Sequence, residues 1–188
     1  MHATILEKEG YSIKYQFHAG ATKPYVVGNG NGIAVAKIAG TNDPASSIVQ
    51  VRQDARILRY CDGLDFVPKL YQFKEIETDC GKYAYLIREH LEGKDIYDIN
   101  YVSAGLLRQL ELQIRTLHEM GIAGLDLAII SVETGICFAH NVIVQAGTPF
   151  LYDFGRSKHL VDLKKEEFDR EKDEDWAEFS YILNTRKD

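Results

Sequence analysis

A five-residue run in which glycine alternates with asparagine, at positions 28–32, constrains the fold more than any other segment of the chain. Asn-Gly steps readily take the positive φ angles of a tight turn, so the run predicts a β-hairpin. Apolar residues precede the run at 24–27 and follow it at 33–38, and both segments are expected to be strands. Residues 11–17 alternate loosely between apolar and polar side chains and add another strand. The segment 11–38 therefore predicts a three-stranded antiparallel meander.

Helical and strand patterns alternate in the rest of the chain. Apolar residues at 48, 51, 55 and 58 step by 3, 4 and 3, which is typical of a helix with one apolar face. The pair Asp43-Pro44 is expected to begin that helix. Residues 71–73 and 83–87 predict two more strands, residues 107–117 repeat the helical spacing, and residues 176–183 predict a last helix.

Five strands with one helix inserted among them, followed by helical segments, indicate an α+β fold. The 188 residues are enough for a single domain with its own core. We expect two lobes within it, a five-stranded antiparallel N-lobe at 1–92 and a reduced helical C-lobe at 93–188.

Composition limits the kinds of partner that the chain is expected to have. The formal net charge is −6, and residues 162–175 contribute −4 of it through eight acids and four bases, which we interpret as a solvated face. No basic face indicates nucleic acid, and no apolar run approaches the length of a membrane span. Three cysteines without metal-ligand spacing indicate a reducing compartment. A cytoplasmic monomer without a signal peptide is expected.

One short motif carries a specific chemistry. Asp153-Phe154-Gly155 follows an apolar run at 142–144, and Asn141 lies directly before that run. An aspartate on a tight Phe-Gly turn just past a strand is how protein kinases hold the magnesium that bridges ATP phosphates. The order of the motifs upstream, along nearly the whole chain, resembles the protein kinase-like superfamily. The resemblance implies ATP and Mg²⁺ as cofactors, with Asn141 and Asp153 as metal ligands.

The resemblance also assigns residues of the N-lobe to phosphate binding. Lys37, in Ala-Val-Ala-Lys, is similar to the third-strand lysine that pairs with the α- and β-phosphates. The strand alone favours an edge-strand lysine that points to water, and the Asp-Phe-Gly motif downstream reverses that preference. Asp54 is similar to the helix acid that pairs with this lysine, one methylene shorter. The interval from Gly20 to Lys37 matches the spacing between the last glycine of the nucleotide loop and the lysine in that family. The glycines at 28–32 are therefore interpreted as a hairpin turn and not as the phosphate loop.

Residues 85–93 resemble the strand and hinge against which adenine stacks. Backbone groups from Glu89 to Leu91 would bind the edge of the base, and Asp95 would lie near the ribose. Arg88 stands where the family places an apolar side chain.

The catalytic loop departs from the family pattern. Gly124-Leu125-Asp126-Leu127 resembles the His-x-Asp-Leu signature with glycine in place of histidine. The resemblance implies that Asp126 orients the attacking hydroxyl and accepts its proton. The interval from Asp126 to Asn141 is longer than in the family, so an insertion across 131–137 must bulge out between them. Glu133, inside this insertion, is the rival catalytic residue.

The chain ends at Asp188, soon after Gly155, so it resembles a minimal kinase such as the small type III effector kinases of plant-associated bacteria. That likeness implies a serine/threonine-protein kinase, secreted into a host cell, whose substrate is a host protein such as a heat-shock chaperone. Two alternatives remain. Leu127-Ala128-Ile129 replaces the Lys-Pro-Glu of typical protein kinases, which favours a small-molecule kinase acting on a sugar, for example. The missing histidine favours a pseudokinase, a binding module without catalysis.

Overall fold

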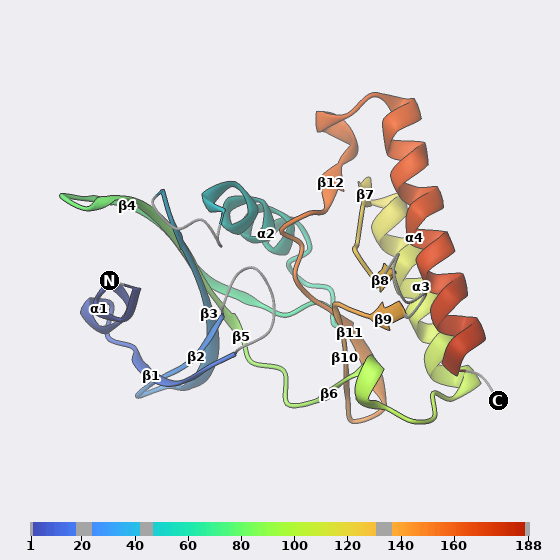
Figure 1. Ribbon diagram of the computed structural model, residues 1–188, viewed down its shortest axis with the longest axis horizontal. Helices are drawn as coiled ribbons and strands as arrows, with labels where there is room; N and C mark the ends of the chain where they lie inside the picture. The colour runs from blue at the N-terminus through green and yellow to red at the C-terminus, as the bar shows by residue number, and fades with distance from the viewer. Residues whose placement is uncertain (1, 18–23, 42–46, 131–136, 187–188) are drawn as a thin grey trace. The chain divides into compact units, whose positions relative to one another are not determined.

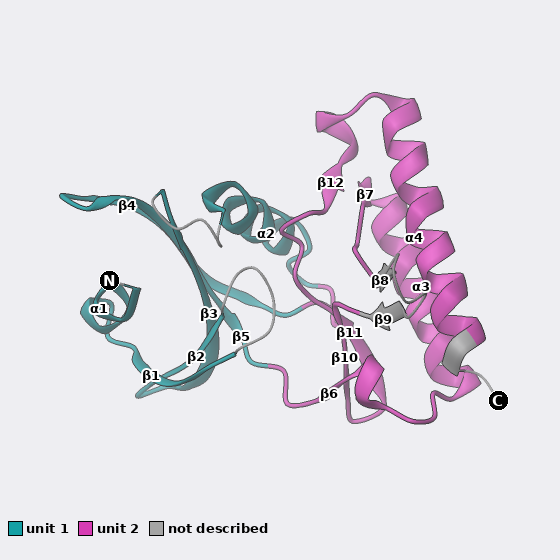
Figure 2. Cartoon of the chain, in the orientation of Figure 1, with its two compact units in different colours: residues 1–63, 68–90 teal, residues 64–67, 91–188 magenta. Residues whose placement is uncertain are grey.

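The structure is a computed structural model that describes residues 2–17, 24–41, 47–130 and 137–186. The chain forms two compact units (Figure 2). Unit 1 comprises residues 1–63 and 68–90, and unit 2 comprises residues 64–67 and 91–188. None of the helices in the described ranges is long and apolar enough to cross a membrane.

Unit 1 is built on a five-stranded antiparallel sheet, which confirms the expected α+β class (Figure 1). Its strands are β1 (Ser12–Gln16), β2 (Tyr25–Asn29), β3 (Gly32–Gly40), β4 (Leu70–Thr78) and β5 (Gly81–Glu89), in the order β1-β2-β3-β5-β4. Asn29 pairs with Gly32, so the alternating glycines and asparagines form the predicted two-residue hairpin turn.

Both faces of this sheet are covered, which explains why β5 is a continuous apolar run. Residues Tyr85 and Ile87 pack in a core with helix α1 (His2–Lys8), which the sequence analysis did not predict. Residues Ala84 and Leu86 pack instead with helix α2 (Ile48–Tyr60). Successive side chains of a strand point to opposite faces, and Figure 1 shows the two helices on opposite sides of the sheet.

Helix α2 begins later than the sequence suggested. Ser47 is its N-cap, and its Oγ accepts a hydrogen bond of 3.4 Å from the backbone N–H of Gln50. The expected start at Asp43 and Pro44 lies outside the described residues.

Unit 2 combines two long helices with short strand pairs. Helices α3 (Ala104–Glu119) and α4 (Lys165–Arg186) pack against each other. The described strands are β6 (Lys94–Asp95), β7 (Ile122–Ala123), β8 (Ala128–Ile130), β9 (Cys137–Ala139), β10 (Val142–Gln145), β11 (Thr148–Leu151) and β12 (Lys158–His159). They form the sheet β11-β10-β6 and the pairs β12-β7 and β8-β9, and the 3₁₀ turns η1 (Ile96–Asp98) and η2 (Leu160–Asp162) complete the unit.

Helix α4 corrects the interpretation of the acidic tail. We expected a helix only from residue 176, but α4 begins at Lys165 and includes most of the charged run. Two glutamates in its first turn complement the helix dipole, and buried Phe168, Glu171 and Asp175 give this half of the helix an inner face. The charged run is therefore an amphipathic helix and not only a solvated surface.

Candidate active site

Lys37 and Asp54 form a buried ion pair in unit 1. Lys37 Nζ lies 2.7 Å from Asp54 Oδ2, and the two side chains are 3% and 1% exposed. Ala36 and Ile38 pack toward α1, so strand alternation turns Lys37 toward α2, which carries Asp54. The structure thus brings together the lysine and the helix acid that the sequence analysis paired.

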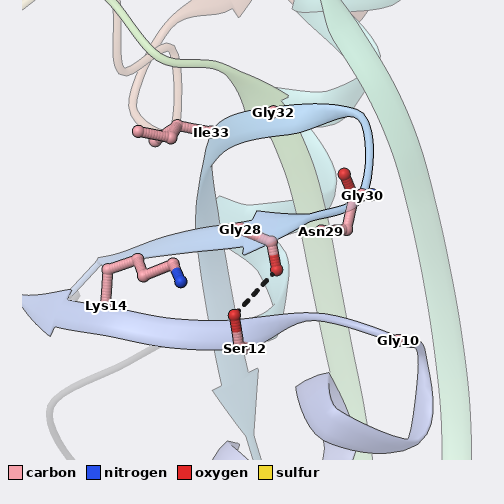
Figure 3. Close-up of a pocket in the computed structure, with 8 residues that line it drawn as sticks. All are labelled: Gly10, Ser12, Lys14, Gly28, Asn29, Gly30, Gly32 and Ile33. Carbon is pink, nitrogen blue, oxygen red and sulfur yellow. Dashed lines mark hydrogen bonds between the residues drawn. The ribbon is translucent and has the colours of Figure 1, made fainter.

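Gly20, the proposed nucleotide-loop glycine, lies outside the described residues. The alternating glycines and asparagines instead form one wall of an open cavity of about 480 Å³ at the β2–β3 turn (Figure 3). Ser12 Oγ donates a hydrogen bond of 3.1 Å to the carbonyl of Gly28 there, and the Lys14 side chain lies over Gly28. This turn lies at the opposite end of β2 from the β1–β2 connection, so it is not the loop that contains Gly20.

The strand end predicted to bind adenine is partly engaged within unit 1. The backbone N–H of Glu89 donates to the carbonyl of Lys69 at 2.8 Å, and Glu89 Oε2 accepts from the Lys69 N–H at 3.1 Å. Arg88, in the family's apolar position, is buried and donates from Nη1 to the carbonyl of Glu89 at 3.2 Å. Glu89 therefore closes the end of the β4–β5 pair, and its N–H is not available to a base.

Asp95 and Leu91 belong to unit 2. Asp95 caps η1 by accepting the Tyr97 N–H at 3.0 Å, and it accepts the Tyr152 hydroxyl at 3.2 Å. Burial raises the pKa of the Asp95 carboxyl above its ordinary value, while these two donors oppose the rise. Leu91 is buried.

Asp126 lies in the loop between β7 and β8, with a positive φ of 54°. Its Oδ2 is 3.5 Å from Nη1 of Arg156, a residue that immediately follows Asp-Phe-Gly and has a largely exposed side chain. Glu133, the rival candidate, lies outside the described residues.

The strands β8 and β9, on either side of the insertion after Asp126, pair with each other. Ala128 of β8 pairs with Ala139 of β9, and the N–H of His140 donates to the carbonyl of Leu127 at 2.6 Å. This pairing brings the residues after the insertion back beside the residues before it. As a result, Asn141 Nδ2 donates to the carbonyl of Asp126 at 3.0 Å although the two residues are well separated in the sequence.

Asn141 also contacts the Asp153 segment. Its carbonyl accepts the N–H of Tyr152 at 3.0 Å, continuing the β10–β11 ladder by one step. Asp153 has a φ of 66°, and its Oδ1 accepts the Gly155 N–H at 3.4 Å. The structure therefore brings the segments of Asp126, Asn141 and Asp153 together.

The side chain of Asn141 has an unused acceptor. Asn141 is 1% exposed, and its Oδ1 has no hydrogen-bond partner within the described part of the chain. A buried amide oxygen without a donor is unfavourable unless something else binds it. Amide and carboxylate oxygens are the ligands that Mg²⁺ prefers, so Asn141 and Asp153 fit this metal. Among the described residues, no group of three or more His, Cys, Asp and Glu side chains is placed to hold a metal.

Two carboxylates of α4 that the sequence analysis did not single out support the Asp126 loop. Asp175 accepts the N–H groups of Gly124 at 3.0 Å and Leu125 at 2.6 Å, and it bonds His118 Nε2 at 2.9 Å. Glu178 Oε2 accepts the N–H groups of Leu127 at 2.6 Å and Ala128 at 3.3 Å. Their i, i+3 spacing, which puts both acids on one helix face, is a sequence signal for them.

Glu178 has a strongly perturbed acidity. Burial raises the pKa of its carboxyl to about 7, and the negative charges of Asp175 and Asp126 act in the same direction. The N–H groups of Leu127 and Ala128 oppose this rise.

The backbone explains why glycine replaces histidine before Asp126. Gly124 has a φ of 72°, and a Cβ at this position would lie 2.8 Å from Glu171 Oε2. Side chains are disfavoured by both the angle and the contact.

Comparisons with known proteins identify the fold. No protein-family model matches the sequence, and no curated protein does. Among solved structures, the kinase PK-1 of Cydia pomonella granulovirus matches with a TM-score of 0.60 and 15% sequence identity. The match covers 83% of this chain and 57% of the viral chain, so the chain spans little more than half the length of that kinase. The chain therefore has a protein kinase-like fold, as the order of its motifs predicted.

Proposed function

We propose that the protein is an ATP- and Mg²⁺-dependent phosphotransferase. The observation that carries this proposal is Asn141, which bonds the Asp126 carbonyl and the Tyr152 N–H and keeps a buried Oδ1 without a donor among the described residues. A kinase-like fold supports the same conclusion.

Each residue has one task in this proposal. Lys37, held by Asp54, binds the phosphates, and Gly20, Glu89, Leu91 and Asp95 contribute the remaining nucleotide contacts, Glu89 through groups other than its engaged N–H. Asn141 and Asp153 hold magnesium, which when bound neutralises charge on the transferred phosphoryl group. Asp126 orients the acceptor hydroxyl and takes its proton. Positioning and electrostatics account for most of the rate in such a site.

We further propose a serine or threonine hydroxyl of a protein as the acceptor. The resemblance to minimal effector kinases supports this choice and makes a host heat-shock chaperone the first acceptor to test. A simple sugar is the second acceptor class.

Labelled phosphate transfer from ATP, measured with the Asp153→Ala variant, tests the proposal. We expect the parent protein to transfer phosphate with magnesium, and Asp153→Ala to lose transfer while remaining folded. Asp173→Ala is a matched control, because Asp173 is exposed on α4. Full activity in Asp153→Ala would contradict the assignment. ATP binding without transfer by the parent protein would support the pseudokinase alternative.

A further inference from the structure

Helix α4 supports the Asp126 loop through the two carboxylates of Asp175 and Glu178. Together these side chains accept four backbone N–H groups, those of residues 124, 125, 127 and 128. The four groups flank Asp126 on both sides. The loop carbonyls of Leu125 and Asp126 accept from Asn141 Nδ2 at 3.4 and 3.0 Å. The backbone that carries Asp126 is therefore fixed through its donors by α4 and through its acceptors by Asn141.

The two carboxylates of α4 differ in their surroundings. Asp175 is 1% exposed and has His118 of α3 as an additional partner. Glu178 is only partly buried and accepts both of its N–H bonds with a single oxygen. The charged groups that act on Glu178 are the acids Asp175, on its own helix, and Asp126, on the loop.

We propose that Glu178 is a positioning residue for phosphotransfer, whose ionised carboxylate fixes the Leu127 and Ala128 N–H groups and thereby aims the Asp126 carboxylate at the acceptor hydroxyl. This inference rests on the proposed function. A hydrogen bond from N–H to an ionised carboxylate is roughly twice as strong as one to a neutral group. Protonation of Glu178 therefore loosens the loop. Since burial raises the pKa of Glu178 to about 7, this change falls close to neutral pH.

Backbone amide signals measure the contact without requiring activity. In a ¹H–¹⁵N NMR titration from about pH 5.5 to about 8.5, we expect the Leu127 and Ala128 amides to shift with a midpoint near 7. The Glu178→Gln variant should remove this titration, and Glu174→Gln should keep it, because Glu174 is exposed on the same helix. The proposal would be overturned if the Leu127 and Ala128 amide shifts of the parent protein did not change with pH. It would also be overturned if their titration were unchanged in Glu178→Gln.

Kinetics measure the consequence for the reaction. Glu178→Ala should lower kcat roughly 10- to 100-fold with little change in KM for ATP, because a misplaced catalytic group costs turnover and not nucleotide binding. Glu178→Gln should recover only part of kcat, since its amide oxygen accepts the same two N–H groups but is neutral, and it should lack the rise of kcat through pH 7 that we expect of the parent.

The outcomes separate this inference from the proposed function. Phosphotransfer by Glu178→Ala equal to that of Glu174→Ala would overturn the role of Glu178 and leave the function standing. If the amides titrate but the parent protein transfers no phosphate, the proposed function fails, and with it the positioning role of Glu178. Glu178→Gln keeps the test valid if the alanine variant fails to fold.

Discussion

Gly124 shows at the residue scale how a single backbone angle decides which side chain a position accepts. Its φ of 72° and the nearby Glu171 Oε2 disfavour any Cβ, although the family signature would place a histidine here. Glu171 has little freedom to move away, because it is buried and paired with Lys158. The departure from the signature therefore has a structural cause in this loop.

We predict that Gly124→Ala destabilises the protein more than Gly147→Ala. Both glycines have a positive φ, which costs an alanine about 1–2 kcal/mol. Only at Gly124 does the added Cβ meet another atom, because nothing lies within 4 Å of that position at Gly147. Urea unfolding of both variants gives the comparison, and equal losses would show that Glu171 moves away freely.

The buried pair of Lys37 and Asp54 leads to a prediction about stability. Asp54→Ala should lower the free energy of unfolding by about 3–5 kcal/mol, because it removes the carboxylate that compensates a buried ammonium. The double variant Lys37→Met/Asp54→Leu should be less destabilised, because both charges of the pair are removed together. Removing the exposed partner Arg52 from its ion pair with Glu75 should have a much smaller effect. A double variant with a lower free energy of unfolding than Asp54→Ala would contradict this account.

At the scale of elements, helix α4 gives unit 2 both an apolar face and an acidic one. Phe168, Phe179 and Ile182 are buried, whereas Asp175 and Glu178 face the Asp126 loop. The loop partners of these acids lie about 50 residues earlier in the chain. Local spacing can show that two acids share a helix face, but it gives no information about a partner so distant. The contacts of α4 with the Asp126 loop were therefore not predictable from the sequence.

Glu178 should make the stability of the protein depend on pH. The pKa of its carboxyl is raised from an ordinary value of 4.5 to about 7, so the folded state binds more protons than the unfolded state between these values. The free energy of unfolding therefore falls as pH rises from about 4.5 to about 7. Urea unfolding at several pH values should show a shallower fall in Glu178→Gln than in Glu174→Gln. Identical curves would contradict the raised pKa.

At the scale of the whole molecule, the sequence predicted what local patterns encode. Strand alternation and the Asn-Gly turn predicted the five-stranded sheet, and helical spacing predicted α2 and α3. Helix α1 was missed, because a short polar segment with two buried apolar side chains gives a weak helical signal. The pairing of β8 with β9 was not predicted, because these strands are very short.

Magnesium should contribute to stability together with ATP. We expect ATP with magnesium to raise the melting temperature, since a ligand at 100 times its Kd stabilises the folded state by about 2.7 kcal/mol. Chelating the magnesium should remove much of this gain, because the proposed ligands, Asn141 Oδ1 and Asp153, would then have no ion to bind. Asn141→Ala should lose the magnesium-dependent part. Equal gains with and without the metal would contradict the assigned ligands.

The β8–β9 pair keeps the residues on its two sides close in space although they are far apart in the sequence. Because its strands begin next to Leu127 and end next to His140, residues can be added or deleted between them without moving Asn141 away from Asp126. Closing a longer loop costs little, about 0.6 kcal/mol for each doubling of its length. This segment of the gene should therefore tolerate insertions and deletions during evolution. A sequence profile that fixes the interval between the two residues would overlook homologues whose intervals differ.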